Sequence, residues 1–282
     1  MRYLVLADIH GNLPALEAIL AAPAAASCEQ IISLGDQVNY SPQSRQVLER
    51  LSGLGAVMLL GNHEERLLHL DSPDLQGYNW TLLHWTARHL NGWKPDLPQD
   101  VRIGPALFTH GMPGDPYKLV SGDAALHPHL DALPDGVTHL FSGHAHKPWH
   151  ITHNGRTAIN PGSAGLGESR VGAQATFSVY DSDAGTVTHH AVAYDADAVA
   201  RAFLLSDAIQ AAPMMCRVVL QTIYTGCETS VTGLMRHIIA VGKPLALTLA
   251  DEAAWHAADP TYAWTEPLST PDYWKMMEDK LL

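Results

Sequence analysis

Five hydrophobic runs along the chain end at residues whose side chains commonly bind metal ions. Each run is rich in aliphatic or β-branched residues and stops at a glycine or a turn, which is the pattern of a buried strand. The runs are LVLADIHGN, IISLGDQVN, VMLLGNHEE, ALFTHGMPG and HLFSGHAHK. Their polar residues are Asp8, His10, Asn12, Asp36, Asn62, His63, His110, His144 and His146. Because ligands of open α/β sheets bind at the carboxyl ends of strands, we expect these side chains to meet at one sheet edge.

Helical spacing alternates with strands in the first part of the chain. Residues 13–26 predict a helix that Pro14 can start, and residues 43–54 and 64–70 predict two more. Residues 78–90 fit an aromatic face for a substrate or, preferably, an amphipathic helix that covers the core. Strands then dominate in RIGPALFTH, THLFSGH, TAIN, ATFSVYD and TVTHHAVAY. This order predicts an α/β fold of two packed sheets flanked by helices.

The pattern changes near residue 200. We expect residues 1–200 to form the core and residues 201–282 to form a mainly helical C-terminal extension, which carries no set of metal ligands. Within it, MMCRVVLQTIY and KPLALTLADEAAWHAA each fit either a helix or a strand. Trp255, Trp264 and Trp274 favour packing on another surface. The extension could cap the site, brace the fold or contact a second subunit, so a homo-oligomer stays open.

The polar residues at the strand ends combine imidazole nitrogen with carboxylate and amide oxygen. That mixture suits Mn, Fe, Zn, Co or Ni better than Ca, which prefers oxygen alone. His144 and His146 are two residues apart, so on an extended stretch they would share a face, whereas on a turn after the strand they can diverge to neighbouring metal ions. One such segment alone is weak evidence, but five in one chain predict a metal centre.

The motifs ADIHG, LGDQ, GNHE, THG and GHAH, in this order, resemble those of the calcineurin-like metallophosphoesterase superfamily. DIHGNLPALEAIL, GHAHKP and NPGSAG resemble its small bacterial and archaeal phosphodiesterase branch, and the likeness covers about residues 1–200. The resemblance implies a four-layer αββα sandwich of two mixed sheets. It also implies a dinuclear centre at which a metal-bridging hydroxide attacks phosphorus in phosphodiesters or small phosphomonoesters.

Carried over by motif, the family pattern assigns two sets of ligands that share the bridging carboxylate of Asp36. The first set is Asp8, His10, Asp36 and His146, and the second is Asp36, Asn62, His110 and His144. The cofactor implied is two divalent transition metal ions, with manganese as the first expectation and Fe, Zn, Ni or Co as alternatives.

The same pattern makes His63 the general acid that protonates the leaving oxygen. In the protein Ser/Thr phosphatase branch, an Asp that steadies this histidine is followed by Arg-Gly. Here those positions hold Asn39, Tyr40 and Ser41, which argues against a protein phosphatase and leaves Asn39 as a weaker partner for His63.

Three residues are expected to contact the substrate: Asn12, Asn39 and Arg170. Arg170 follows the glycine-rich loop NPGSAGLGESR, which lies beside the site in the family and lacks the spacings of a nucleotide-binding loop. Its guanidinium could pair with a phosphate at two points or could simply be solvated on a turn.

Composition limits the partners and the compartment. Among 282 residues, 29 are Asp or Glu and 17 are Lys or Arg, which gives a formal charge of −12. The sequence has no cluster of Lys and Arg, so its charge argues against an extended nucleic acid as a partner but leaves a nucleotide or short oligonucleotide open. The substrate implied by the resemblance is a small phosphate ester. Cys28, Cys216 and Cys227 form no C-x-x-C pair, and neither a signal peptide nor a membrane-spanning run is evident. We therefore expect a cytoplasmic protein without a membrane partner.

The leading hypothesis is a metal-dependent phosphodiesterase or phosphatase. Within the enzymes, the alternative is a nucleotide phosphatase or a cyclic-nucleotide phosphodiesterase. Outside them, the alternatives are a non-catalytic scaffold on the same fold, which generally lacks the acid histidine or several ligands, and a nucleotide-sensing regulator that uses the extension.

Overall fold

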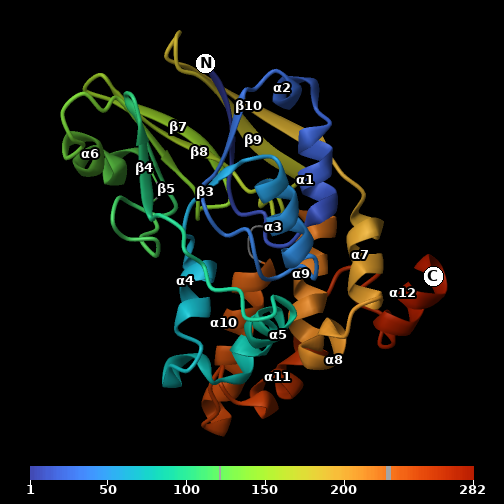
Figure 1. Ribbon diagram of the computed structural model, residues 1–282. Coiled ribbons are helices and arrows are strands. Elements are labelled where there is room, and N and C mark those ends of the chain that lie inside the picture. Colours follow the sequence, from blue (N-terminus) through green and yellow to red (C-terminus); the bar gives the residue numbers. More distant parts are fainter. Residues whose placement is uncertain (121, 227–229) are drawn as a thin grey trace.

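The computed structural model describes residues 1–120, 122–226 and 230–282 (Figure 1). Its first sheet has the strand order β10-β9-β1-β2-β3. These strands are β1 (Arg2–Leu6), β2 (Gln30–Ser33), β3 (Val57–Met58), β9 (Gln174–Asp181) and β10 (Thr186–Ala193). The neighbours β1, β2 and β3 run parallel, whereas β9 is antiparallel to both β1 and β10. The sheet is therefore mixed, as expected.

The second sheet has the order β4-β5-β6-β8-β7. Its strands are β4 (Asp100–Ile103), β5 (Ala106–Thr109), β6 (His139–Ser142), β7 (Pro148–His153) and β8 (Arg156–Pro161). Strands β5, β6 and β8 are parallel, and antiparallel β4 and β7 form its two edges. Phe108 of β5 pairs in register with Phe141 of β6, and their rings stack with centroids 4.8 Å apart.

The two sheets pack face to face, and the alternation along β1 shows how. Tyr3 and Val5 point into the core between the sheets, while Leu4 and Leu6 point to the outer face. Because both faces of this strand are buried, its sequence is continuously hydrophobic rather than alternating. The buried strand predicted for this segment is confirmed.

Helices complete the four layers. The outer face of the first sheet is covered by α1 (Leu13–Leu20) and α3 (Ser44–Gly53), with the short α2 (Pro23–Ala26) after α1. The outer face of the second sheet is covered by α6 (Asp123–Asp131), which the sequence pattern did not predict because Pro128 lies inside it. The αββα sandwich expected from the resemblance is confirmed.

The remaining helices gather at one end of the sandwich (Figure 1). They are α4 (Asn62–Leu68), α5 (Thr81–His89), α7 (Ala196–Leu204), α8 (Ala208–Ala211), α9 (Pro213–Thr225), α10 (Ser230–Gly242), α11 (Glu252–Ala258) and α12 (Tyr273–Leu281). Residues of α7 to α12 share one hydrophobic cluster with Leu82, Trp85 and Leu166 of the core. The segment MMCRVVLQTIY lies in the helix α9, and KPLALTLADEAAWHAA forms a short 3₁₀ turn and α11 without a strand.

Two further expectations concern cysteines and membranes. Cys28 and Cys216 are free thiols, while Cys227 lies outside the described residues. No helix in the described part of the chain has the length and apolar character that crossing a bilayer requires.

The packing of the extension predicts a large effect of Trp255. Its side chain is fully buried, and its indole N–H donates to the carbonyl oxygen of Leu249. Trp255→Ala should lower the free energy of unfolding by about 3–5 kcal/mol, because it leaves a cavity. Urea denaturation of the full chain measures this. Leu205→Ala, at a side chain that is 76% exposed, is the control and should change it by less than about 0.5 kcal/mol. Equal effects would contradict this packing.

Candidate metal centre

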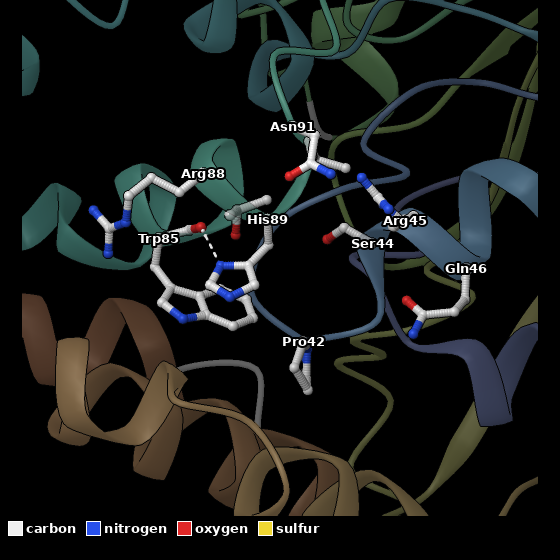
Figure 2. A pocket seen from close by; sticks show the side chains of 10 residues that line it. Pro42, Ser44, Arg45, Gln46, Trp85, Arg88, His89 and Asn91 are labelled. Carbon is white, nitrogen blue, oxygen red and sulfur yellow. Dashed lines mark hydrogen bonds between the residues drawn. The ribbon is translucent and has the colours of Figure 1, made fainter.

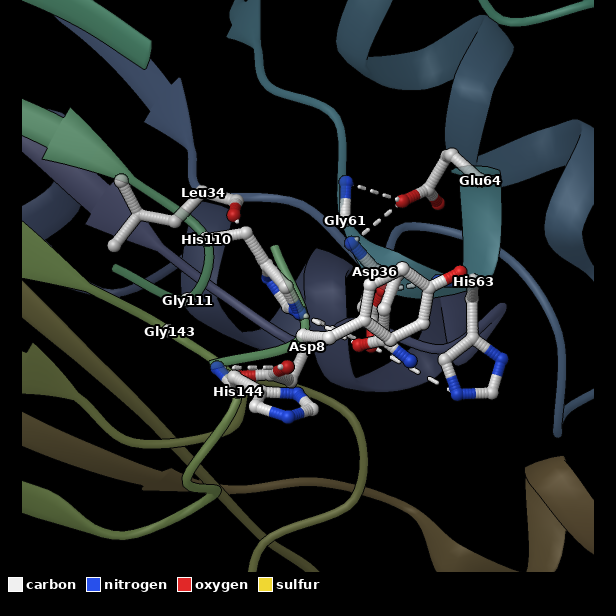
Figure 3. Close-up of polar contacts among 12 residues, drawn as sticks. Asp8, Leu34, Asp36, Gly61, His63, Glu64, His110, Gly111, Gly143 and His144 are labelled. Atoms are coloured by element: carbon white, nitrogen blue, oxygen red, sulfur yellow. Dashed lines mark hydrogen bonds and ion pairs between the residues drawn. The ribbon is translucent and has the colours of Figure 1, made fainter. Parts of the chain in front are cut away.

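The polar residues that follow the predicted strands lie close together, at the carboxyl ends of strands from both sheets. The order is β1 then Asp8 and His10, β2 then Asp36, β3 then Asn62 and His63, β5 then His110, and β6 then His144 and His146. Because β1, β2 and β3 are parallel in one sheet and β5 and β6 are parallel in the other, their carboxyl ends meet at a common edge. Figure 3 shows side chains from both sheets directed toward one another there.

The backbone at this edge is unusual. Asp8, His10, Asp36, His144 and His146 all have positive φ, between 50° and 65°. Residues with a Cβ seldom adopt this left-handed conformation, and such strain concentrates at functional sites. The turns after β1, β2 and β6 thus use unfavourable backbone to aim side chains at one point.

The first cluster joins Asp8, His10 and His146, whose ligand atoms all lie within 4.8 Å of one another. Nε2 of His10 is 3.1 Å from Nε2 of His146, and the latter is 3.5 Å from a carboxylate oxygen of Asp8. On the far side of each ring, Nδ1 of His10 faces the carbonyl of Val38 at 3.3 Å and Nδ1 of His146 faces that of Leu166 at 3.1 Å.

The second cluster joins Asp36, His110 and His144 within the same limit. Nε2 of His110 is 3.4 Å from a carboxylate oxygen of Asp36 and 2.9 Å from the amide oxygen of Asn62. That amide oxygen also lies 3.0 Å from Nδ1 of His144 and 3.2 Å from Asp36. Nδ1 of His110 faces the carbonyl oxygen of Leu34 at 2.9 Å.

These contacts bring hydrogen-bond acceptors close to one another without donors between them. A carbonyl oxygen only accepts, so His10 and His146, whose pKa values are lowered by burial, carry their proton on Nδ1 and present a bare Nε2. Two such nitrogens 3.1 Å apart cannot bond to each other. A cation would satisfy all of these atoms at once. The chemistry of the donor set therefore fits divalent metal ions.

Burial sets the protonation of these groups. It lowers the pKa of His144 to about 4 and of His146 to about 3, so both imidazoles are neutral at pH 7. Burial would also lower the pKa of His110, but the charge and hydrogen bond of Asp36 raise it to about 9. In the same way the pKa of Asp36 is well below its usual range, because His110 and His63 outweigh its burial. Asp36 is the charged centre of the cluster.

His63 forms a third group with His10 and Asp36, whose ligand atoms also lie within 4.8 Å of one another. Its Nε2 lies 3.8 Å from a carboxylate oxygen of Asp36, and its backbone N–H donates to the other oxygen. Nδ1 is 2.8 Å from the amide nitrogen of Asn39, whose oxygen accepts from the hydroxyl of Thr86. Asn39 therefore orients His63 through the ring atom that faces away from the site. Burial lowers the pKa of His63 to about 4.

A cavity of about 320 Å³ opens onto this group of residues. Its described lining includes Asp36, Asn62, His63, His144 and His146 from the clusters. Leu119, Leu166 and Glu168 come from loops, and Val231 and Thr232 come from α10 of the extension. A solute of modest size can thus reach the side chains that carry the chemistry.

Comparison with known proteins agrees with this geometry. The model of the calcineurin-like phosphoesterase superfamily domain matches residues 1–185. The chain belongs to this superfamily. The family typically binds divalent metal ions, and the clusters described above could hold them. Helices α7 to α12 lie beyond the matched residues.

Solved and curated relatives extend the comparison. A metallophosphoesterase from Sphaerobacter thermophilus is 26% identical, with a TM-score of 0.64 over 80% of this chain and 100% of that one. A hypothetical protein from Pyrococcus horikoshii shares the fold, with 21% identity and a TM-score of 0.64 over 80% and 98% of the two chains. An uncharacterized protein of Methanocaldococcus jannaschii is 25% identical over 177 residues, which are 59% of this chain and 71% of the relative.

The candidate metal centre also depends on Glu64, for which the sequence motifs predicted no role. Its buried carboxylate accepts hydrogen bonds from the backbone N–H groups of Asp36 and Gly61 (Figure 3), and also from that of Val38. Gly61 must be glycine, because a Cβ there would lie 2.2 Å from the Asp36 carboxylate. The available signal was a glutamate three residues after a helix cap, which is the position of a capping box.

The loop after β8 supports the centre from the other side. The amide of Asn160 donates to the carbonyl of Gly143, and the hydroxyl of Ser163 donates to that of Asp8. Asn12, an expected substrate contact, is fully buried, donates to the carbonyl of Gly165 and caps α1. Both ends of its amide thus serve the fold. Arg170 is exposed and does not line the site cavity, and Asn39 contacts His63 as described.

A larger cavity of about 550 Å³ lies between α5 and the start of α3 (Figure 2). His89 stacks on Trp85 there, with ring centroids 4.0 Å apart, and Nδ1 of His89 bonds to the carbonyl of Trp85. No expected metal ligand lines this cavity in the described residues. The volume of a cavity therefore does not identify the functional site here, because the candidate metal ligands line the smaller cavity.

Glu64 gives a prediction about stability. Glu64→Ala should lower the free energy of unfolding by at least about 1–3 kcal/mol, because three buried N–H groups lose their acceptor. Urea denaturation of metal-free protein at pH 6 measures this, since burial raises the pKa of Glu64 to about 7 and the charge then matters least. Glu49→Ala, on the exposed face of α3, is the control. A loss no larger than that of the control would refute the role of Glu64.

Proposed function

We propose that this protein is a dinuclear metal-dependent phosphoesterase that hydrolyses phosphodiesters or small phosphomonoesters. The observation that supports it most is the pair of buried clusters, in which carboxylates and bare imidazole nitrogens from both sheets crowd together. One ion would be held by Asp8, His10, Asp36 and His146, and the other by Asp36, Asn62, His110 and His144. The mixed nitrogen and oxygen set suits manganese, our first choice, as well as Fe, Co, Ni or Zn.

When bound, two such ions activate water as a nucleophile and offset the charge of the phosphoryl group. The protein's own residues do the rest. Asp36 lies between the clusters and keeps its negative charge, so it can bridge two cations. His63 stands at the rim with its Nε2 toward Asp36, where it can donate a proton to the departing oxygen. Asn39 holds that ring in place.

The size and charge of the site support a small substrate. Its cavity of about 320 Å³ is at the lower end of the range for small-molecule pockets. Arg66 supplies a positive charge in its lining for a phosphate oxygen. The chain as a whole has a formal charge of −12, which disfavours an extended nucleic acid.

Metal binding should stabilise the folded chain. Adding Mn²⁺ to metal-free protein should raise the thermal unfolding midpoint by several degrees, because a ligand at 100 times its Kd adds about 2.7 kcal/mol. Asp36→Asn should abolish most of that shift, whereas His256→Ala, at an exposed histidine of α11, should keep it. Differential scanning fluorimetry gives the readout. If Mn, Fe, Co, Ni and Zn all leave the midpoint of the wild-type chain unchanged, the metal centre is disproved.

His63 should matter for turnover and not for metal binding. The manganese-loaded protein should hydrolyse both bis-p-nitrophenyl phosphate and diphenyl phosphate. His63→Ala should lower kcat on diphenyl phosphate by about 10²–10⁴-fold, and by less on the p-nitrophenyl ester, whose leaving oxygen needs a proton less. The manganese-induced thermal shift should persist.

His69→Ala is the matched control, because His69 is exposed at the end of the same helix. Equal losses on the two esters would show that His63 does not act as the acid. Absence of turnover in the wild-type chain with any of the metals would argue for a non-catalytic scaffold.

A further inference from the structure

A second cavity, of about 350 Å³, adjoins the cavity of the metal centre. The two share five lining residues: Tyr40, His63, Arg66, Val231 and Thr232. Because these residues line both cavities, the two cavities are neighbours with the His63 ring in their common wall. We call it the adjoining cavity.

The lining of the adjoining cavity differs from that of the centre. Its other residues are mainly apolar or aromatic: Asn39, Asn79, Trp80, Leu82, Leu83, Met215, Met235 and Leu249. Leu82, Leu83 and Met215 are buried beneath it, while Trp80 and Met235 are partly exposed at its walls. No carboxylate lines it in the described residues, whereas Asp36 and Glu168 line the cavity of the centre. The adjoining cavity therefore suits an uncharged organic group.

The extension builds much of this cavity. Met215 comes from α9, Val231 and Met235 come from successive turns of α10, and Leu249 precedes α11. These residues lie beyond the part of the chain that matches the phosphoesterase family. The cavity is thus shaped jointly by the matched domain and by the extension.

Arg66 lies at the junction of the two cavities and is held by aromatic rings. Its guanidinium carbon lies 5.0 Å from the ring centroid of Trp80 and 5.1 Å from that of Tyr117. Such cation–π contacts fix a cation without neutralising it. A phosphate at the metal centre would meet this charge at the point where its organic group turns into the adjoining cavity.

The geometry points to a leaving-group subsite: the adjoining cavity binds the organic part of a phosphate ester whose leaving alcohol carries an uncharged aromatic or apolar group. This inference rests on the proposed function, since His63 must face the departing oxygen. The group bonded to that oxygen then extends past His63, between Tyr40 and Val231, toward Trp80 and Met235. The volume suits a group of one or two rings.

Binding of two phosphonates tests the subsite without requiring turnover. Phenylphosphonate and methylphosphonate carry the same acidic head group, but only the first has a ring for the cavity. Isothermal titration into the manganese-loaded full chain should give phenylphosphonate at least about tenfold higher affinity, as expected for burial of a ring.

Two variants and a control locate that preference. Met235→Trp fills the adjoining cavity, and Trp80→Ala removes an aromatic wall, so each should cut the preference to less than about threefold while methylphosphonate still binds. Ile239→Trp lies one turn further along α10 at a half-exposed side chain that does not line the cavity, so it should keep the preference. Because one variant fills the cavity and the other removes part of its wall, the result does not depend on the correct folding of a single variant.

The outcomes separate the two proposals. If the wild-type chain hydrolyses esters and binds both phosphonates equally, the subsite is wrong and the proposed function stands. A phenyl preference that survives in both Met235→Trp and Trp80→Ala would also overturn the subsite. If neither phosphonate binds and no ester is hydrolysed, the proposed function fails and the subsite fails with it.

Discussion

The structure is organised around one electrostatic constraint, the crowding of lone pairs where the two sheets meet. His10 and His146 donate hydrogen bonds from Nδ1 to the backbone carbonyls of Val38 and Leu166, so their Nε2 atoms face inward bare. Buried acceptors without donors destabilise a fold unless a cation joins them. The turns and loops around the site hold these side chains close together before a cation is bound.

The supports are mostly backbone groups that belong to distant parts of the chain. Left-handed turns follow β1, β2 and β6, and the buried carboxylate of Glu64 gathers three backbone N–H groups beneath Asp36. The loop after β8 ties Asp8 and Gly143 from behind. Because each contact fixes a ligand-bearing turn instead of a ligand atom, the site is shaped by the fold before any ligand arrives.

The sequence predicted the site better than it predicted the surroundings. Strand ends are visible in one sequence because hydrophobic runs stop abruptly, so the five convergent segments and the partnership of Asn39 with His63 could be inferred. The role of Asn12 as a helix cap was missed, since a buried amide and a substrate contact look alike in a sequence. Helix α6 was not predicted because it contains Pro128. The segment MMCRVVLQTIY is buried on all sides, so it lacks the hydrophobic periodicity that distinguishes a helix from a strand.

What no sequence pattern could give is the adjoining cavity, because its walls come from segments more than one hundred residues apart. Trp80 and Leu83 precede the second sheet, whereas Met215 and Met235 follow the first. Their meeting depends on the shared hydrophobic cluster that seats α7 to α12 against α5 and Leu166. The same packing that stabilises the extension therefore determines which residues stand next to His63. Since the metal ligands come from the matched domain and part of the adjoining cavity comes from the extension, substitutions at Met215, Met235 or Leu249 could change leaving-group selection without altering a metal ligand.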